Sequence, residues 1–289
     1  MKTTRWEYST GRIEGFFESD GLHLKNESRD TKDGALIGQL LLPYRLLSRD
    51  GWHGEGRETP HAMAVLDNGI ECRWPASLAH PADLTIRTTL GGEGVFDVSI
   101  RIEARHGFRD YELFYSNYFD RISRSLHGGA YVASLPAEKP VVPGWTQVFP
   151  GANPIFREMY IAFPRDEHGA ALICDGRWQR GRHFTRFAPC RYYAEPIGFY
   201  HNPGTGLAVS MMASREDCYS VSMAYRADDP HDKVGQHCSL YLSLFGRDIQ
   251  PGETANARLR MVADDSGADA TRHFAHFEEF SNSIETNAS

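Results

Sequence analysis

Side chains able to exchange protons are concentrated in one short segment, from Trp52 to His61. It holds two histidines, two glutamates and one arginine, which are His53, Glu55, Arg57, Glu58 and His61. In an extended chain, alternate residues point to one side, so His53, Glu55 and Arg57 would share a face. Imidazole and carboxylate pKa values can both be tuned toward neutrality. We therefore expect His53 to act as a proton donor and Glu55 or Glu58 as a base, with Arg57 binding substrate. A solvated loop rich in charge is the alternative.

The same segment offers ligands for a metal ion. Imidazole and carboxylate groups suit zinc, manganese or iron. The spacing matches neither a His-Glu-x-x-His helix nor a His-x-His pair. We therefore expect no cofactor, and a divalent metal held by His53, Glu55 and His61 stays open as a second possibility.

A second cluster is rich in arginine and aromatic residues. Five arginines lie within 15 residues, at positions 177, 180, 182, 186 and 191. A guanidinium group holds a carboxylate or phosphate through two parallel hydrogen bonds. An aromatic ring beside it offers a flat surface to a sugar. We expect Arg177, Trp178 and Arg182 to bind a hydroxyl-rich or anionic sugar, unless these arginines pair with the protein's own carboxylates.

Further candidate contacts are scattered along the chain. Tyr200 and His201 precede the turn Asn202-Pro203-Gly204, where side chains often project toward a ligand. His201 is the alternative proton donor, and Tyr200 would position the substrate. Three more candidates for substrate binding are Asn117 at the end of an aromatic run that continues to Tyr118, His127 before two glycines, and Trp145 in the Pro- and Gly-rich stretch Leu135–Pro154.

Composition excludes several classes of protein. The formal net charge of −7 argues against a nucleic-acid partner. No apolar stretch has the roughly 18 residues that a membrane span requires, and Met1–Gly11 is polar. Five cysteines without a Cys-x-x-Cys pair predict reduced thiols and a cytoplasmic protein. Neither a phosphate-binding loop nor a Gly-x-Ser-x-Gly elbow is present. The sequence does not indicate an oligomeric state.

Short alternating segments dominate the hydrophobic pattern and predict β-strands. The expected strands are Ile70–Trp74, Leu84–Thr89, Val95–Ala104, Tyr111–Tyr115, Glu158–Ala162, Ala170–Cys174, Gly206–Met212, Tyr219–Tyr225, Ser239–Phe245 and Arg258–Val262. We expect helices over Tyr118–Leu126 and after Asp269, where Phe274, Phe277 and Phe280 share a face. A long loop is expected over Leu135–Pro154. The whole pattern predicts an all-β protein, with residues 1–289 forming one large antiparallel sandwich.

Two features resemble a known architecture. The segment Tyr241–Glu253 reads as a strand and a Pro-Gly-Glu turn, and the strand Ala257–Val262 follows it. With the run His127-Gly128-Gly129, this is similar to the galactose mutarotase-like β-supersandwich superfamily. The resemblance implies a supersandwich with a concave, ligand-binding sheet. Aldose epimerases of that superfamily use a His acid and a Glu base, but here the strand Ser239–Phe245 contains no carboxylate.

These observations favour a carbohydrate-active enzyme of the epimerase, isomerase or lyase type. Its substrate would be a sugar or a uronic-acid derivative, and its chemistry would use His and Glu side chains. Two alternatives remain open. One is a non-catalytic carbohydrate-binding protein, and the other is a metal-dependent enzyme that uses the His/Glu cluster.

Overall fold

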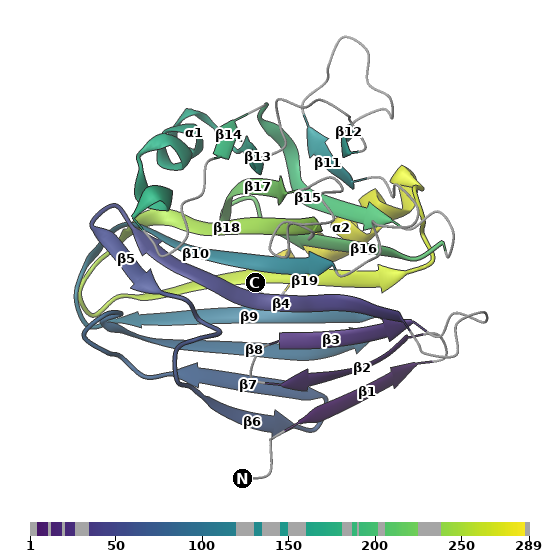
Figure 1. The fold of residues 1–289 in the computed structure, drawn as a ribbon, viewed down its shortest axis with the longest axis horizontal. Coiled ribbons are helices and arrows are strands. Elements are labelled where there is room, and N and C mark those ends of the chain that lie inside the picture. The colour runs from purple at the N-terminus through teal and green to yellow at the C-terminus, as the bar shows by residue number, and fades with distance from the viewer. Residues whose placement is uncertain are drawn as a thin grey trace, which may run out of the picture.

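A computed structural model describes eleven segments of the chain. They are residues 5–10, 13–18, 21–26, 35–119, 130–134, 145–149, 160–180, 187–189, 191–201, 206–224 and 238–286. Within them the chain forms two large sheets, an α-helix at one margin and a second α-helix near the C-terminus (Figure 1). The predicted all-β sandwich with a C-terminal helix is confirmed.

The larger sheet contains ten strands. Its order is β1 (Trp6–Thr10), β2 (Ile13–Glu18), β3 (Gly21–Asn26), β4 (Ala35–Ser48), β10 (Phe108–Phe119), β18 (Cys238–Ile249), β17 (Cys218–Ala224), β13 (Tyr160–Pro164) and β14 (Phe187–Pro189), and β5 (Gly51–Gly54) pairs with β4. Neighbouring strands are antiparallel except β13 and β14, which are parallel.

The smaller sheet contains nine strands, and all of its pairs are antiparallel. Its order is β12 (Trp145–Phe149), β11 (Ala130–Ser134), β15 (Tyr193–His201), β16 (Ala208–Ala213), β19 (Thr254–Asp264), β9 (Val95–Ala104), β8 (Ala82–Gly92), β7 (Gly69–Trp74) and β6 (Ala62–Leu66). Strands of both sheets run in similar directions across Figure 1.

Period-two alternation assigns each side chain to the core or to an outer face. On β10, Leu113 and Tyr115 enter the main core between the sheets, together with Ile100 of β9. Phe114, which lies between them, and Tyr118, which lies further along the strand, join a separate aromatic cluster on the outer face of the larger sheet. One strand therefore supplies both the core that holds the sandwich together and the surface discussed below.

The C-terminal helix forms where its cap and apolar spacing predict it. Helix α2 spans Ala270–Thr286, and Asp269 Oδ1 accepts the backbone N–H groups of Thr271 (3.0 Å) and Arg272 (3.4 Å). Its apolar side chains cover the outer face of the smaller sheet, where Phe280 is buried beside Trp145 and Phe199. None of the helices in the described segments is long and apolar enough to cross a membrane.

Three local predictions need correction. The strand predicted at Ala170–Cys174 is wrong, because these residues belong to helix α1 (Glu167–Cys174). Asp166 caps the N-terminus of that helix, because its Oδ1 accepts the N–H of Gly169 at 2.8 Å. A short apolar run is compatible with a strand or a helix, and here the N-cap favours the helix. The stretch Leu135–Pro154 is not loop throughout, since β12 lies within it. The helix predicted at Tyr118–Leu126 begins within β10, and residues 120–126 lie outside the described segments.

Gly94, in the turn between β8 and β9, occupies a position that only glycine fits. Its φ is +69°, and an added Cβ would lie 2.1 Å from the carbonyl oxygen of Ala263. Gly252, in the Pro-Gly-Glu turn, has a φ of +80° and open space around it. We expect Gly252→Ala to cost about 1–2 kcal/mol through backbone strain alone. Gly94→Ala should cost more because of the added clash. Urea denaturation of both variants measures the difference, and equal losses would contradict the prediction.

Candidate functional site

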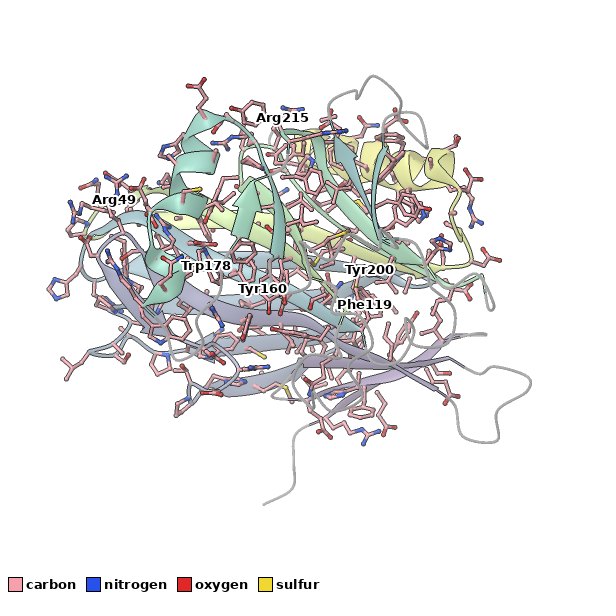
Figure 2. The ribbon with its side chains drawn as sticks, turned by 45° about the horizontal axis from the view of Figure 1, so that its top comes forward. Arg49, Phe119, Tyr160, Trp178, Tyr200 and Arg215 are labelled. Atoms are coloured by element: carbon pink, nitrogen blue, oxygen red, sulfur yellow. The ribbon has the colours of Figure 1, made fainter. Side chains whose placement is uncertain are left out.

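Four tyrosines gather on the outer face of the larger sheet, each from a different strand. They are Tyr44 of β4, Tyr118 of β10, Tyr160 of β13 and Tyr241 of β18, and we call them the tyrosine cluster. Ring centroids are 5.5 Å apart for Tyr44 and Tyr118, 5.9 Å for Tyr118 and Tyr241, and 5.7 Å for Tyr160 and Tyr241. Figure 2 shows Tyr160 close to Trp178 on this side of the sheet.

Two phenols of this cluster, those of Tyr118 and Tyr241, keep their protons. Burial, together with the neighbouring Tyr44, raises the pKa of Tyr118 well above its usual value. Burial, followed by the influence of Tyr118 and Tyr160, does the same to the pKa of Tyr241. A protonated phenol both donates and accepts a hydrogen bond. The cluster therefore presents aromatic rings and hydroxyl groups at one place.

Arg57 reaches this cluster from the turn that follows β5. The backbone N–H of Gly56 donates to the Tyr44 carbonyl at 3.2 Å, and Trp74 Nε1 donates to the Gly56 carbonyl at 2.8 Å. These bonds fix the turn against the edge of β4 and tie it to β7. The Arg57 guanidinium carbon then lies 4.6 Å from the centre of the Tyr44 ring and 5.9 Å from that of Tyr118. Such distances allow cation–π attraction.

Glu55 holds Arg57 in this position. Its Oε2 accepts Nε of Arg57 at 3.3 Å and Nη2 at 3.2 Å. The other oxygen, Oε1, is buried and has no hydrogen-bond partner among the described residues. Burial lowers the pKa of Arg57, but interactions with Tyr118, Tyr44 and Glu55 outweigh it and raise the pKa overall. Arg57 is therefore a permanent cation beside the phenols.

Trp178 closes one side of the aromatic face, and Arg177 anchors it. Trp178 is buried, with its ring 4.3 Å from Phe114 and its indole 5.1 Å from the Arg45 guanidinium carbon. Arg177 donates to both oxygens of Asp175, to the Asp110 carbonyl and to Glu112. It is 1% exposed, so its guanidinium is occupied inside the protein. We therefore remove Arg177 from the predicted substrate-binding residues.

His53 lies elsewhere, among other aromatic side chains. Its Nδ1 is 2.9 Å from the Ala79 carbonyl, and its Nε2 is 2.9 Å from Ser48 Oγ. Its ring packs at 5.1 Å on Phe108 and at 6.0 Å on His80. Burial lowers the pKa of His53. Both ring nitrogens are thus engaged within the protein, away from the tyrosine cluster.

Tyr200 and His201 are neighbours in β15 and so point to opposite sides. Tyr200 enters the core between the sheets, where its ring packs 4.8 Å from Phe119 (Figure 2). His201 faces outward from the smaller sheet, 5.8 Å from Tyr131. Neither residue shares a face with Arg57, and the two predicted proton donors His53 and His201 do not meet.

Two other predicted contacts are structural parts of the core. Asn117 is fully buried, with Oδ1 accepting the Leu41 N–H at 2.8 Å and Nδ2 at 3.4 Å from the sulfur of Met261. Trp145 is buried beneath helix α2, 4.8 Å from Phe274. We leave both residues out of the candidate site.

Among the described residues, the predicted ligands His53, Glu55 and His61 do not form a metal centre. His61 stacks on Trp74 at 4.5 Å, its Nδ1 is 3.0 Å from the Thr59 carbonyl, and Glu58 is exposed. In the segments that the structure describes, no three His, Cys, Asp or Glu side chains are arranged to hold a metal ion, so His53, Glu55 and His61 form no such group. His127 and Arg182 lie outside the described residues.

Sequence reasoning missed Tyr44, Tyr160 and Tyr241. Tyr44 lies in an apolar run that predicts nothing about ligands, and Tyr241 begins the strand and Pro-Gly-Glu turn that carry the family resemblance. What they share is a face of one sheet, and that property depends on strand pairing.

Known proteins resemble this chain in fold and not in sequence. Neither a protein-family model nor a curated protein sequence matches it. A putative aldose 1-epimerase from Escherichia coli K12 is similar in structure, with a TM-score of 0.52 and 11% identity over 91% of this chain and 99% of that one. The Slr1438 protein from Synechocystis sp. PCC 6803 is also similar in structure, with a TM-score of 0.53 and 11% identity over 92% of this chain and 97% of that one.

A larger protein contains the same architecture. The α-N-acetylgalactosaminidase NagBb from Bifidobacterium bifidum, solved in complex with GalNAc, gives a TM-score of 0.54 and 12% identity over 95% of this chain and 38% of that one. Identities this low speak for the fold alone. The chain therefore shares the fold of these proteins, and this is the β-supersandwich that the resemblance of its C-terminal strand-turn-strand segment predicts.

Proposed function

We propose that the protein binds a carbohydrate on the outer face of its larger sheet, at the tyrosine cluster and Arg57. The observation that carries this proposal is the convergence of four phenols and one guanidinium group on a single face. Aromatic rings pack against the apolar C–H face of a sugar, while phenol and guanidinium groups hydrogen-bond its hydroxyls. Tyr118, Tyr160 and Arg57 are all half-buried, so each keeps part of its surface for a ligand.

The fold gives independent support to a sugar ligand. Among the structures with this architecture, one is described as a putative aldose 1-epimerase and another was solved with GalNAc. Fold does not by itself determine function. The proposal therefore rests on the side chains, and the fold raises the expectation that they meet a sugar.

An epimerase-type reaction is the second candidate, and Glu55 favours it. Interconversion of sugar anomers needs a base for the anomeric hydroxyl proton and an acid for the ring oxygen. Glu55 has one carboxylate oxygen, Oε1, without a hydrogen-bond partner among the described residues, and because this oxygen is buried behind Arg57 a role as base requires the Arg57 side chain to move aside when the sugar binds. Tyr118, whose phenol stays protonated, is the proposed proton donor. We propose no catalytic role for His53 or His201.

Sugar binding should depend on Tyr118. We expect Tyr118→Ala to weaken the affinity for a bound sugar about tenfold or more, because it removes a ring contact and a hydrogen bond worth about 1–3 kcal/mol together. Calorimetric titration with the monosaccharide that gives the largest thermal shift measures this. Tyr192→Ala is the control, since Tyr192 is an exposed tyrosine outside the cluster. Equal affinities in the two variants would count against the proposed site.

Catalysis is tested separately. Polarimetry of freshly dissolved aldoses reports conversion between anomers. If the epimerase proposal holds, the unmodified protein accelerates this conversion and Glu55→Gln does not, since the amide cannot take up the proton of the anomeric hydroxyl. Sugar binding without accelerated mutarotation in the unmodified protein would leave the binding function and remove the enzymatic one.

A further inference from the structure

We infer that the sugar carries an acidic group, a carboxylate or a phosphate, and that Arg57 recognises its negative charge. This inference rests on the proposed function, because it assigns a substrate class to the same face. It follows from how the hydrogen-bonding groups of Arg57 are used.

Arg57 leaves much of its guanidinium group unused. Nε and Nη2 both donate to the same oxygen of Glu55, at 3.3 and 3.2 Å. The usual arrangement of an arginine with a carboxylate uses two oxygens and two parallel bonds. Here Nη1 donates no hydrogen bond to any described residue. One edge of the planar group therefore remains available.

Part of the Arg57 side chain is exposed to solvent, whereas its partner Glu55 is buried. The Arg57 side chain is 29% exposed, whereas the Glu55 side chain is 3% exposed. The carboxylate thus lies behind the guanidinium and holds it from the protein side. The outer side of the guanidinium is left for a ligand that contacts the tyrosine cluster.

The surrounding side chains suit an anion in that position. Tyr44 contacts two guanidinium groups, with the carbon of Arg45 4.7 Å and that of Arg57 4.6 Å from its ring centre. The hydroxyl of Tyr44 accepts a hydrogen bond from Nη2 of Arg45 at 3.1 Å. In a half-buried site, attraction between opposite charges is stronger than in bulk water. An acidic sugar would gain this attraction, and a neutral sugar would not.

Calorimetric titration with matched sugars tests the inference. Glucuronate is compared with glucose and galacturonate with galactose, and glucose 6-phosphate tests for a phosphate in place of a carboxylate. We expect one acidic sugar to bind about tenfold or more tightly than its neutral counterpart, the range expected for hydrogen bonds to a charged group. In Arg57→Gln the ratio of the two affinities should fall to near one. Arg57→Lys keeps the charge without the planar group and should give an intermediate ratio.

Arg105→Gln is the matched control. Arg105 is an exposed arginine paired with Asp83, so its replacement removes the same charge away from the tyrosine cluster. The ratio should be unchanged in this variant. Equal binding of acidic and neutral sugars by the unmodified protein would overturn the inference and leave the proposed function intact, as would a ratio that survives Arg57→Gln. Failure of every sugar to bind would overturn both.

Discussion

Arg177→Ala is expected to lower the free energy of unfolding by about 3–5 kcal/mol, the usual cost of leaving one member of a buried ion pair unpaired. Glu112, which would lose this partner, is fully buried. Burial raises the pKa of Glu112 even in the presence of Arg177, whose charge opposes the shift. The variant also releases the turn that presses Trp178 on Phe114. Chemical denaturation followed by intrinsic fluorescence measures the loss.

A double variant separates the ion pair from general damage to the core. Replacing Arg177 and Glu112 together, as in Arg177→Met with Glu112→Leu, removes the buried carboxylate and should recover the part of the loss that comes from Glu112, while Asp175, which is 18% exposed, still loses its partner. If the single variant loses under 1 kcal/mol, or if the double variant loses the sum of both single losses, the pair does not have the assigned role.

Two buried histidines should make the protein sensitive to mild acid. Burial lowers the pKa of His80 to about 4 and that of His273 to about 4. His80 Nε2 is 2.9 Å from the Tyr111 hydroxyl, and His273 stacks at 3.7 Å on Phe199. In the unfolded chain a histidine takes up a proton near pH 6.5. Between pH 6.5 and 4 the unfolded state therefore binds more protons than the folded state.

The sign of this linkage makes stability fall as the pH is lowered through that window. Each histidine should account for a loss of about 3 kcal/mol. Urea unfolding at several pH values from 7 to 4 gives the slope. His273→Gln should show a shallower slope than the unmodified protein, whereas His106→Gln, which replaces an exposed histidine, should not. Parallel slopes in all three proteins would contradict the assignment for His273.

Much of the sandwich could be predicted because alternation is a local property. Strand β9 has the predicted bounds, Val95–Ala104, since Val98, Ile100 and Ile102 interleave with polar residues whatever the strand pairs with. Helix α2 was equally predictable from Asp269 and the spacing of three phenylalanines. The N-terminal strands were missed. In β4 the run Leu40–Leu42 does not alternate, because all three residues are buried at irregularities in the pairing with β10.

The residues of the candidate site were likewise predictable only where a local sequence pattern marks them. The sequence by itself determined that Arg57 and Trp178 lie in polar and aromatic clusters, and both residues contact the aromatic face. Only the tertiary structure decided that Tyr44, Tyr118, Tyr160 and Tyr241 meet, or that His53 and His201 do not. The physical reason is that alternation acts within a strand, whereas these neighbours arise from pairing between strands that are distant in the sequence, as where Phe119 of β10 pairs with Cys238 of β18.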